Sequence, residues 1–465
     1  MIETGVSLAR RLERYRETAR IAPASEDGPR PPERAAALAE RLAIVMDGEV
    51  VVTDEGTIVR CEVPSRPIPV DRDRLAGLPG QPPSDAPLVC LDTETTGLAT
   101  AAGTVAWLIG LGWWEQDRFR QVQLLLPDHA EERALLTALA ATIAPDAWLV
   151  TYNGRGFDWP LLVARYRLAR RAAPSHGGHL DLLPIVRRLF RHRMANARLR
   201  TAEAELLGMH RVGDVEGWEI PSRYLQFLHG GPADVLVDVV RHNDQDVRSL
   251  ARLLVHLETR FGDAARRAEA ISGDLAGLAR AFAREHRLGE ALDCLDVAVV
   301  QSGSEPEPVA PIRVAARETA TAGDDPWWSP RRPADFGGRP GRTPAVGGPP
   351  RTAAFDAPWT TERIAMDRAH LLRRLGRWTD AADAWGAIAM STGRNAIIAT
   401  IELAKLYEHR LADRPAAMAA VLRGFALVDR RRRIGRPEPA LEADLVRRHD
   451  RLRRRGAGIR RRSIA

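Results

Sequence analysis

The sequence predicts an α/β fold, in which a mixed β-sheet is flanked by helices, followed by an α-helical region. Between residues 88 and 171, short apolar segments predict three strands, a helix, a strand and a helix, with further helices after them. From residue 360 to 428, apolar residues recur at helical spacing. The first pattern is typical of a layered α/β domain, and the second is typical of stacked helical hairpins.

Composition points to a globular chain with more than one domain. Its 465 residues suggest two or three domains, and 45% hydrophobic residues provide a sizeable core. No segment approaches the ~20 apolar residues of a membrane span. The three cysteines (Cys61, Cys90 and Cys294) show neither metal-ligand spacing nor a disulfide pattern. We expect a cytoplasmic protein without membrane association.

The charge distribution favours an anionic partner. The net charge is +7, and residues 430–465 hold fourteen arginines against four acids. Such a run can neutralise the phosphates of a nucleic acid. It can equally be a solvated helix end, and the sequence leaves both interpretations open.

Changes in composition divide the chain into six expected segments. These are 1–86, a lead-in and linker with a small hairpin around Asp54-Glu55-Gly56; 87–262, the α/β domain; 263–300, a helical hairpin; 301–358, a disordered linker rich in Pro, Gly and Ser; 359–430, a helical region; and 431–465, an Arg-rich tail. Residues 369–385 resemble a tetratricopeptide-type helix-turn-helix, so the helical region is expected to stack repeat upon repeat.

The strand predicted over residues 88–91 leads into the first acidic block, Asp92-Thr93-Glu94-Thr95-Thr96-Gly97-Leu98. Because Asp92 and Glu94 are two residues apart in an extended segment, both side chains leave the same face of the sheet. Two carboxylates on one face can hold a hard cation such as Mg²⁺. An acidic turn is the simpler explanation for an isolated Asp-x-Glu pair, but not for one with Thr-Thr-Gly-Leu after it.

The second and third acidic blocks lie on helices. Asp158 follows a strand and the loop at Asn153, where the simpler role is a helix N-cap. His242 and Asp246 are i and i+4 on a helix expected from about 233 to 257, so they share one face. On the same helix, Asp244 is expected to face solvent, and Asp238 competes as an orienting partner for His242.

Together these blocks resemble the three exonuclease motifs of the DEDD superfamily, which has a ribonuclease-H-like fold, and specifically its YprB-like group. The resemblance covers residues 86–260, and includes His179-Leu180-Asp181-Leu182-Leu183 and Gly217 to Tyr224. A tetratricopeptide-like C-terminal region also fits this group. The third block departs from the superfamily pattern, because its histidine stands at the spacing normally taken by a tyrosine.

The resemblance implies metal-dependent hydrolysis of DNA or RNA, usually from the 3′ end. Asp92, Glu94, Asp158 and Asp246 would hold two Mg²⁺ or Mn²⁺ ions. His242 would be the general base, since a histidine with a pKa near neutrality can accept a proton from water.

Other residues are candidates for contacts with the nucleic acid. These are Thr95, Asn153, Arg187, Arg188 and Arg191. Asn153 could instead hold its loop, and the arginines could be a solvated helix face. Asp181 is expected to cap the helix that follows it, although contact with an arginine or with substrate is also open.

The sequence thus predicts a metal-dependent nuclease, expected to be a 3′–5′ exonuclease, tethered to helical repeats that could dock a protein partner. Two alternatives remain. One is a nucleic-acid-binding adaptor whose site is idle, and the other is a protein-docking scaffold built on the repeats.

Overall fold

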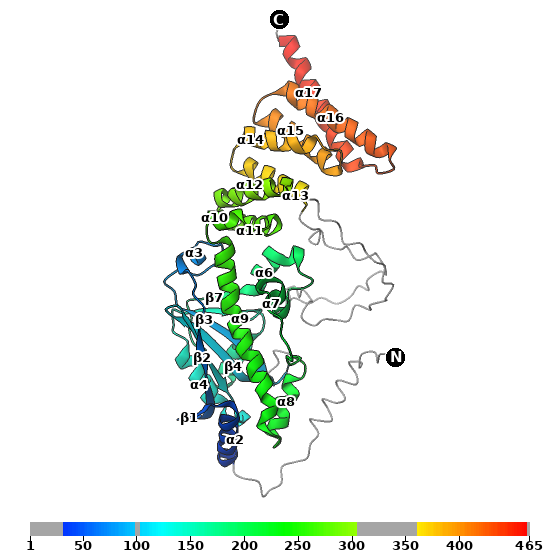
Figure 1. Ribbon diagram of the computed structural model, residues 1–465. Coiled ribbons are helices and arrows are strands. Elements are labelled where there is room, and N and C mark those ends of the chain that lie inside the picture. Colours follow the sequence, from blue (N-terminus) through cyan, green and yellow to red (C-terminus); the bar gives the residue numbers. More distant parts are fainter. Residues whose placement is uncertain (1–30, 98–102, 305–359, 463–465) are drawn as a thin grey trace.

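The computed structural model describes residues 31–97, 103–304 and 360–462, so most of the linker expected at 301–358 lies outside the described residues. One seven-stranded mixed sheet organises the first half of the chain (Figure 1). Its strands run in the order β1-β2-β5-β4-β3-β6-β7. They are β1 (Glu49–Thr53), β2 (Gly56–Pro67), β3 (Leu88–Thr95), β4 (Ala106–Glu115), β5 (Arg118–Leu125), β6 (Trp148–Thr151) and β7 (Gly178–Asp181).

Strand β3 lies where the sheet changes from antiparallel to parallel pairing. It pairs antiparallel with β4 and parallel with β6, and β6 pairs parallel with β7. Strand β3 is buried on both faces, as its apolar start Leu88-Val89-Cys90-Leu91 requires. Leu88 and Cys90 pack into one core, and Val89 and Leu91 pack into the core on the other face. Side chains therefore alternate along this strand as the sequence predicts.

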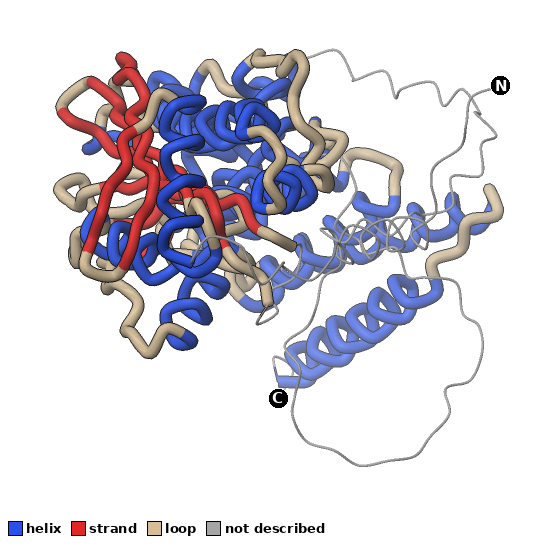
Figure 2. The backbone as a smooth tube through the Cα atoms, turned by 90° about the horizontal axis from the view of Figure 1, so that it is seen from below, coloured by secondary structure: helices blue, strands red, loops and turns tan. Residues whose placement is uncertain are grey.

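Helices cover both faces of the sheet, as Figure 2 shows from below. The long helix α9 crosses β3, β4 and β5 on one face. On the other face, α2 and α4 pack against β2. The helices of this half are α2 (Pro31–Met46), α3 (Arg72–Ala76), α4 (Glu132–Thr142), α5 (Asp158–Leu168), α6 (Leu182–Phe190), α7 (Leu199–Leu207), α8 (Ile220–Leu228) and α9 (Val237–Phe261), with 3-10 turns η1 (His129–Glu131), η2 (Arg191–Arg193) and η3 (Ala233–Leu236).

The hairpin expected around Asp54-Glu55-Gly56 is present, and it belongs to the main sheet. Strands β1 and β2 pair with Thr53 opposite Gly56, and β2 then pairs antiparallel with β5 from Val59 to Pro67. The sheet therefore begins at Glu49 and not after residue 87. Pairing between β2 and β5 joins residues about sixty positions apart, which local sequence patterns do not reveal.

The C-terminal half is a run of helices that extends away from the sheet (Figure 1). Consecutive helices from α11 to α17 pack on one another, including α12 against α13 across residues 305–359. They are α10 (Ala264–Ala268), α11 (Ser272–Arg284), α12 (Leu288–Ser304), α13 (Thr361–Arg374), α14 (Trp378–Ala389), α15 (Arg394–His409), α16 (Arg414–Arg433) and α17 (Pro439–Arg462). A helical region is thus present, while its tetratricopeptide-type assignment stays a prediction.

Helix α11 joins the helical region to the α/β domain through α6. A Cβ on Gly277 would lie 2.6 Å from the Arg188 carbonyl oxygen, so this glycine lets the two backbones approach closely. Beside it, Arg193 donates two hydrogen bonds of 3.0 Å to Asp274, whose side chain is 1% exposed. A buried, bidentate arginine–carboxylate pair fixes the orientation of the two elements.

Several arginines of the basic C-terminal segment form ion pairs within the helical region. Arg431 pairs with Glu438, and Arg448 and Arg451 both pair with Glu408. Glu408 is only 2% exposed, so these arginines stabilise the contact between α15 and α17. Among the described helices, none is long and apolar enough to cross a membrane.

Candidate active site

The first two acids lie on β3, on the face covered by α9. Asp92 and Glu94 share the face of Leu88 and Cys90, as their spacing predicts. Asp92 pairs with Gly110 of β4, and Asn243 of α9 lies over this glycine. The Asn243 side-chain nitrogen donates to Asp92 Oδ2 at 2.9 Å, and so fixes one carboxylate oxygen.

The third acid approaches from the opposite side of β3. Asp158 is the first residue of α5, and Phe157 occupies the N-cap position, so Asp158 is not the helix cap. The Thr93 hydroxyl, between Asp92 and Glu94 in the chain, donates to Asp158 Oδ1. Because β6 runs parallel to β3, its carboxyl end delivers this acid to the edge of the sheet where β3 ends.

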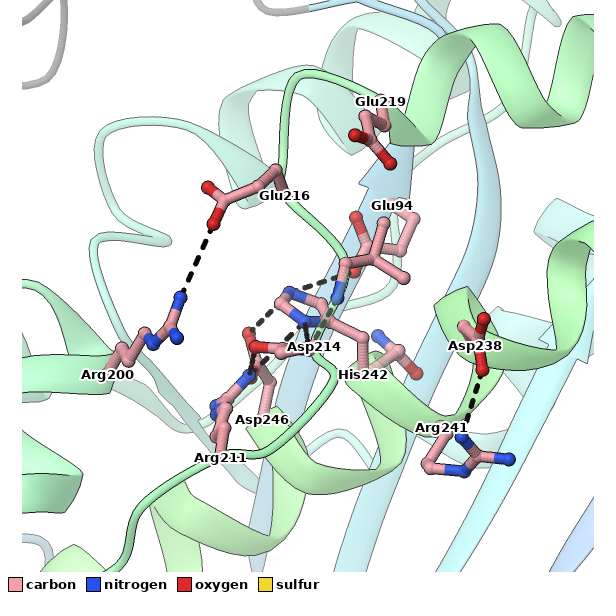
Figure 3. A network of polar contacts seen from close by, with 12 residues as sticks. Glu94, Arg200, Arg211, Asp214, Glu216, Glu219, Asp238, Arg241, His242 and Asp246 are labelled. Atoms are coloured by element: carbon pink, nitrogen blue, oxygen red, sulfur yellow. Dashed lines mark hydrogen bonds and ion pairs between the residues drawn. The ribbon is translucent and has the colours of Figure 1, made fainter. Parts of the chain in front are cut away.

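Helix α9 supplies the remaining predicted residues from one face. His242 Nε2 lies 3.9 Å from Glu94 Oε1 and 3.6 Å from Asp246 Oδ2, so His242 stands between the two acids (Figure 3). Asp244 does not face solvent as expected. Its side chain is 18% exposed and pairs with Arg248, one helical turn further along α9, and its backbone carbonyl accepts a hydrogen bond from Gln121 of β5.

The partner of His242 is Asp214, which the sequence does not indicate. His242 Nδ1 and Asp214 Oδ1 are 2.6 Å apart, so Nδ1 donates to this carboxylate and Nε2 is left facing Glu94 and Asp246. Asp238, which lies one helical turn from His242, pairs instead with Arg241, as Figure 3 shows, and with Arg223. Local spacing cannot show that the loop between α7 and α8 reaches this histidine.

A buried arginine from the same loop also enters the site. Arg211 pairs with Glu203 of α7, Asp214 and Asp246, and its side chain is 3% exposed. Its Nη1 lies 3.2 Å from His242 Nδ1. The only signal in the sequence is Gly213, which directly precedes Asp214, and in the structure this glycine has a φ of +68°.

Mutual repulsion and burial shape the proton affinities of the acids. Burial, and then the charge of Asp246, raise the pKa of Asp92 well above its usual range. Burial raises the pKa of Glu94 to about 8 against the opposing charge of His242, and raises that of Asp158 to about 6 against the hydrogen bond from Thr93. The fourth acid is close enough to oppose ionisation of the first two, so the acids form one cluster.

In the His242–Asp214 pair, the contacts between the two side chains favour the charged form of each. Burial alone would lower the pKa of His242, but the hydrogen bond to Asp214 and the charge of Asp246 outweigh it and raise this pKa to about 10. Burial would likewise raise the pKa of Asp214, but the bond to His242 outweighs it and lowers that pKa to about 2. The two side chains thus form an imidazolium–carboxylate pair at neutral pH.

The residues predicted to contact nucleic acid fall into two groups. Thr95 and Asn153 lie beside the acids, where the Thr95 hydroxyl donates to the Gly97 carbonyl and the Asn153 backbone N–H donates to Asp181 at 2.8 Å. Asp181 also accepts from the Leu183 N–H, which confirms it as the helix cap. Asn153, at φ +71°, is held in its loop by this carboxylate.

The three arginines of α6 and its end do not share one location. Arg187 lies near Tyr152, where burial raises the pKa of the phenol and the Arg187 charge opposes that rise. Arg188 lies at the junction with α11, close to Arg284 and Glu285. Arg191 is exposed where α6 ends. Their roles toward a nucleic acid stay predictions.

The acid cluster fits divalent cations by its donor chemistry. In the described part of the chain, no arginine or lysine pairs with Asp92, Glu94 or Asp158, and Glu94 faces only the His242 imidazole, at 3.9 Å. Carboxylate oxygens are the ligands that Mg²⁺ and Mn²⁺ prefer. Within those same residues, no three His, Cys, Asp or Glu side chains are already arranged as a metal-binding group. The four acids must therefore move to act together as metal ligands. Among them, Asp246 is the one that pairs with an arginine, Arg211.

Comparison with known proteins agrees with this architecture. Residues 89–258 match the family model of the RNase_H superfamily. The chain is 39% identical over 176 residues to the protein YprB of Bacillus subtilis (strain 168), a match that covers 37% of this chain and 42% of YprB. The chain therefore spans less than half the length of this relative.

A solved structure shows a weaker likeness. It is the family B DNA polymerase of the hyperthermophilic archaeon Pyrobaculum calidifontis, with a TM-score of 0.31 and 15% identity over 50% of this chain and 32% of the polymerase. The mixed sheet with helices on both faces, the family match and the identity to YprB lead to one conclusion. Residues 89–258 have a ribonuclease-H-like fold and are similar to the RNase_H superfamily and to YprB.

Proposed function

We propose that this protein is a metal-dependent nuclease that hydrolyses phosphodiester bonds, acting as a 3′–5′ exonuclease by a two-metal mechanism. The observation that carries the proposal is the meeting of Glu94 and Asp246 at His242, with Asp92 on the same face of β3 and Asp158 at the same strand end. The four side chains come from three separate elements, so a shared chemical role explains their convergence better than local structure does.

The net charge of the site supports two divalent ions. Six carboxylates, the four motif acids with Asp214 and Glu203, face the guanidinium of Arg211 and the imidazolium of His242. When all six acids are ionised, six negative and two positive charges leave an excess of four, which two divalent cations would neutralise; this repulsion is also among the causes that raise the pKa values of Asp92 and Glu94. Asp92, Glu94, Asp158 and Asp246 would hold these ions. When bound, the ions supply charge stabilisation for the attacking and leaving oxygens of a phosphodiester.

The protein's own residues fix the geometry for proton transfer. Asp214 holds Nδ1 of His242, so Nε2 is the atom that faces the acids and can exchange a proton with water. Neutralising Glu94 and Asp246 would remove charges that now raise the His242 pKa, and would bring it toward the range of a general base. Asn243 keeps one oxygen of Asp92 fixed throughout.

Cleavage of end-labelled single-stranded DNA and RNA tests the proposal. We expect products that shorten from the 3′ end with Mn²⁺ or Mg²⁺, and none with EDTA. Asp92→Asn should abolish cleavage, whereas Asp244→Asn, an equal change on a carboxylate that pairs with Arg248, should retain it. Cleavage by purified Asp92→Asn protein would overturn the site assignment. Salt-sensitive binding without cleavage by the unmodified protein would favour the adaptor.

A further inference from the structure

A four-residue turn, Arg211-Val212-Gly213-Asp214, directs two opposite charges into the proposed metal site. The side chain of Val212 is 96% exposed, whereas that of Arg211 is 3% exposed, so the turn faces solvent at its tip and the acids at its ends. Gly213 provides the positive φ that reverses the chain. Figure 3 shows Arg211 and Asp214 converging on His242 and Asp246.

Arg211 is anchored independently of the motif acids. Its Nε donates to Glu203 Oε2 at 2.6 Å and its Nη2 donates to Glu203 Oε1 at 2.5 Å, in a bidentate pair. Glu203 is fully buried and also accepts a hydrogen bond from the Ser249 hydroxyl of α9. A guanidinium held in this way is a fixed positive charge at the edge of the site.

The Arg211 guanidinium also binds one of the four motif acids. Nη2 of Arg211 also donates to Asp246 Oδ1, while Asp246 Oδ2 faces His242 Nε2 at 3.6 Å. Both oxygens of Asp246 thus face cationic groups of the protein. Asp92 and Asp158 instead accept from the uncharged side chains of Asn243 and Thr93. Asp246 is the motif acid that a metal ion can reach only in competition with an arginine.

We propose that Arg211 competes with a divalent cation for Asp246, so that the site binds metal by displacing an internal cation. The inference rests on the proposed function, because it assumes that Asp246 is a metal ligand. Release of Asp246 leaves the guanidinium satisfied, since Arg211 keeps both bonds to Glu203 and a 3.1 Å bond to Asp214. A rotation of the Asp246 side chain is therefore enough to break its contact with Arg211, and the buried arginine stays paired with Glu203 and Asp214.

Calorimetric titration of the full chain with Mn²⁺, without nucleic acid, tests the competition. Arg211→Gln removes the competing charge, and we expect roughly tenfold tighter binding, equivalent to one charge-assisted hydrogen bond no longer broken. Arg211→Lys keeps the charge but cannot bridge Glu203 and Asp246 as a fork, so its affinity should be intermediate. Arg241→Gln makes the same charge change on α9 next to His242, where Arg241 is 67% exposed and pairs with Asp238, and should match the unmodified protein.

The outcomes separate this inference from the proposed function. Equal or weaker Mn²⁺ binding by Arg211→Gln, beside normal binding by the unmodified protein, overturns the competition alone. Absence of Mn²⁺ binding by the unmodified protein and by Arg211→Gln overturns the metal-dependent function and the competition together. If Arg211→Gln does not fold because Glu203 is left unpaired, the Arg211→Lys titration decides: tighter binding supports the competition, and equal or weaker binding overturns it.

Discussion

Gly110 lies directly across from Asp92 in the β3–β4 pair, and the space above this glycine holds the Asn243 side chain that hydrogen-bonds to Asp92. Gln123 of β5 in turn donates to Asn243 Oδ1 at 2.9 Å. Three elements thus fix the first acid of the cluster through one amide. The absence of a side chain at residue 110 is what lets α9 approach the sheet closely enough to form this contact.

Gly110→Ala is expected to destabilise the protein and disturb the site. The added Cβ would lie 2.2 Å from Asn243 Oδ1, so α9 must shift, at a cost of about 1–3 kcal/mol for overpacking. Urea unfolding measures the change. Gly386→Ala is the control, because its Cβ meets no atom within 4 Å in α14 and alanine favours a helix by about 0.5–1 kcal/mol. Equal stability of the two variants would contradict the close approach.

Gly213→Ala is expected to reduce Mn²⁺-dependent cleavage by misplacing the turn that carries Arg211 and Asp214. Alanine at φ +68° costs roughly 1–2 kcal/mol, although open space surrounds the new Cβ. Misplacing a positioning group typically lowers a rate by roughly 10- to 100-fold. Gly217→Ala, in the same loop with open space and no positive φ, should cleave normally. If both variants keep full activity, the turn does not position the site.

Protonation of His256 should contribute a loss of stability between pH 6.5 and pH 4. Burial, and then the charges of Arg260 and Arg193, lower the pKa of this histidine from 6.5 to about 4. The unfolded chain therefore binds a proton first as the pH falls, and the folded state loses roughly 2–3 kcal/mol across this interval.

Thermal unfolding at several pH values tests this dependence. His256→Phe keeps an aromatic ring beside Phe190 and should reduce the loss of stability between pH 6.5 and pH 4, leaving the part due to His179, whose pKa burial also lowers to about 4. His229→Phe, at an exposed position, should leave the profile unchanged. An undiminished loss of stability in His256→Phe would assign the dependence to other groups.

Asp274→Ala is expected to loosen the helical region from the α/β domain. It leaves Arg193 without its bidentate partner at the α6–α11 junction, at a cost of about 3 kcal/mol. Hydrogen exchange should then accelerate in α11 more than in the sheet. Asp293→Ala, on the exposed side of α12, serves as the control and should exchange as the unmodified protein does.

Periodic features of the fold and site are the ones that the sequence predicts. Two-residue spacing placed Asp92 and Glu94 on one face of a strand, and four-residue spacing placed His242 and Asp246 on one face of a helix. The hairpin before the domain was also expected, but its pairing with β5 was not, because long-range register has no local pattern.

The supporting residues were missed for a related reason. Arg211 and Asp214 stand in a loop without periodicity, and only tertiary packing brings them to α9. Asp238 competes as an orienting partner for His242 because it lies one helical turn away. Two arginines, Arg223 and Arg241, hold that carboxylate instead. Spacing along a helix identifies neighbours on its surface, but it does not say which neighbour has a better partner elsewhere.

The contact between α12 and α13 has a consequence for how this chain can be cut and rejoined. These helices pack against each other, although residues 305–359 separate them in sequence. Their apolar side chains belong to the same core, which continues from the sheet into the helical region. Packing of side chains, and not the covalent link between Ser304 and Thr360, therefore joins α12 to α13. Two fragments that end after Ser304 and begin before Thr360 should bind each other as a split protein.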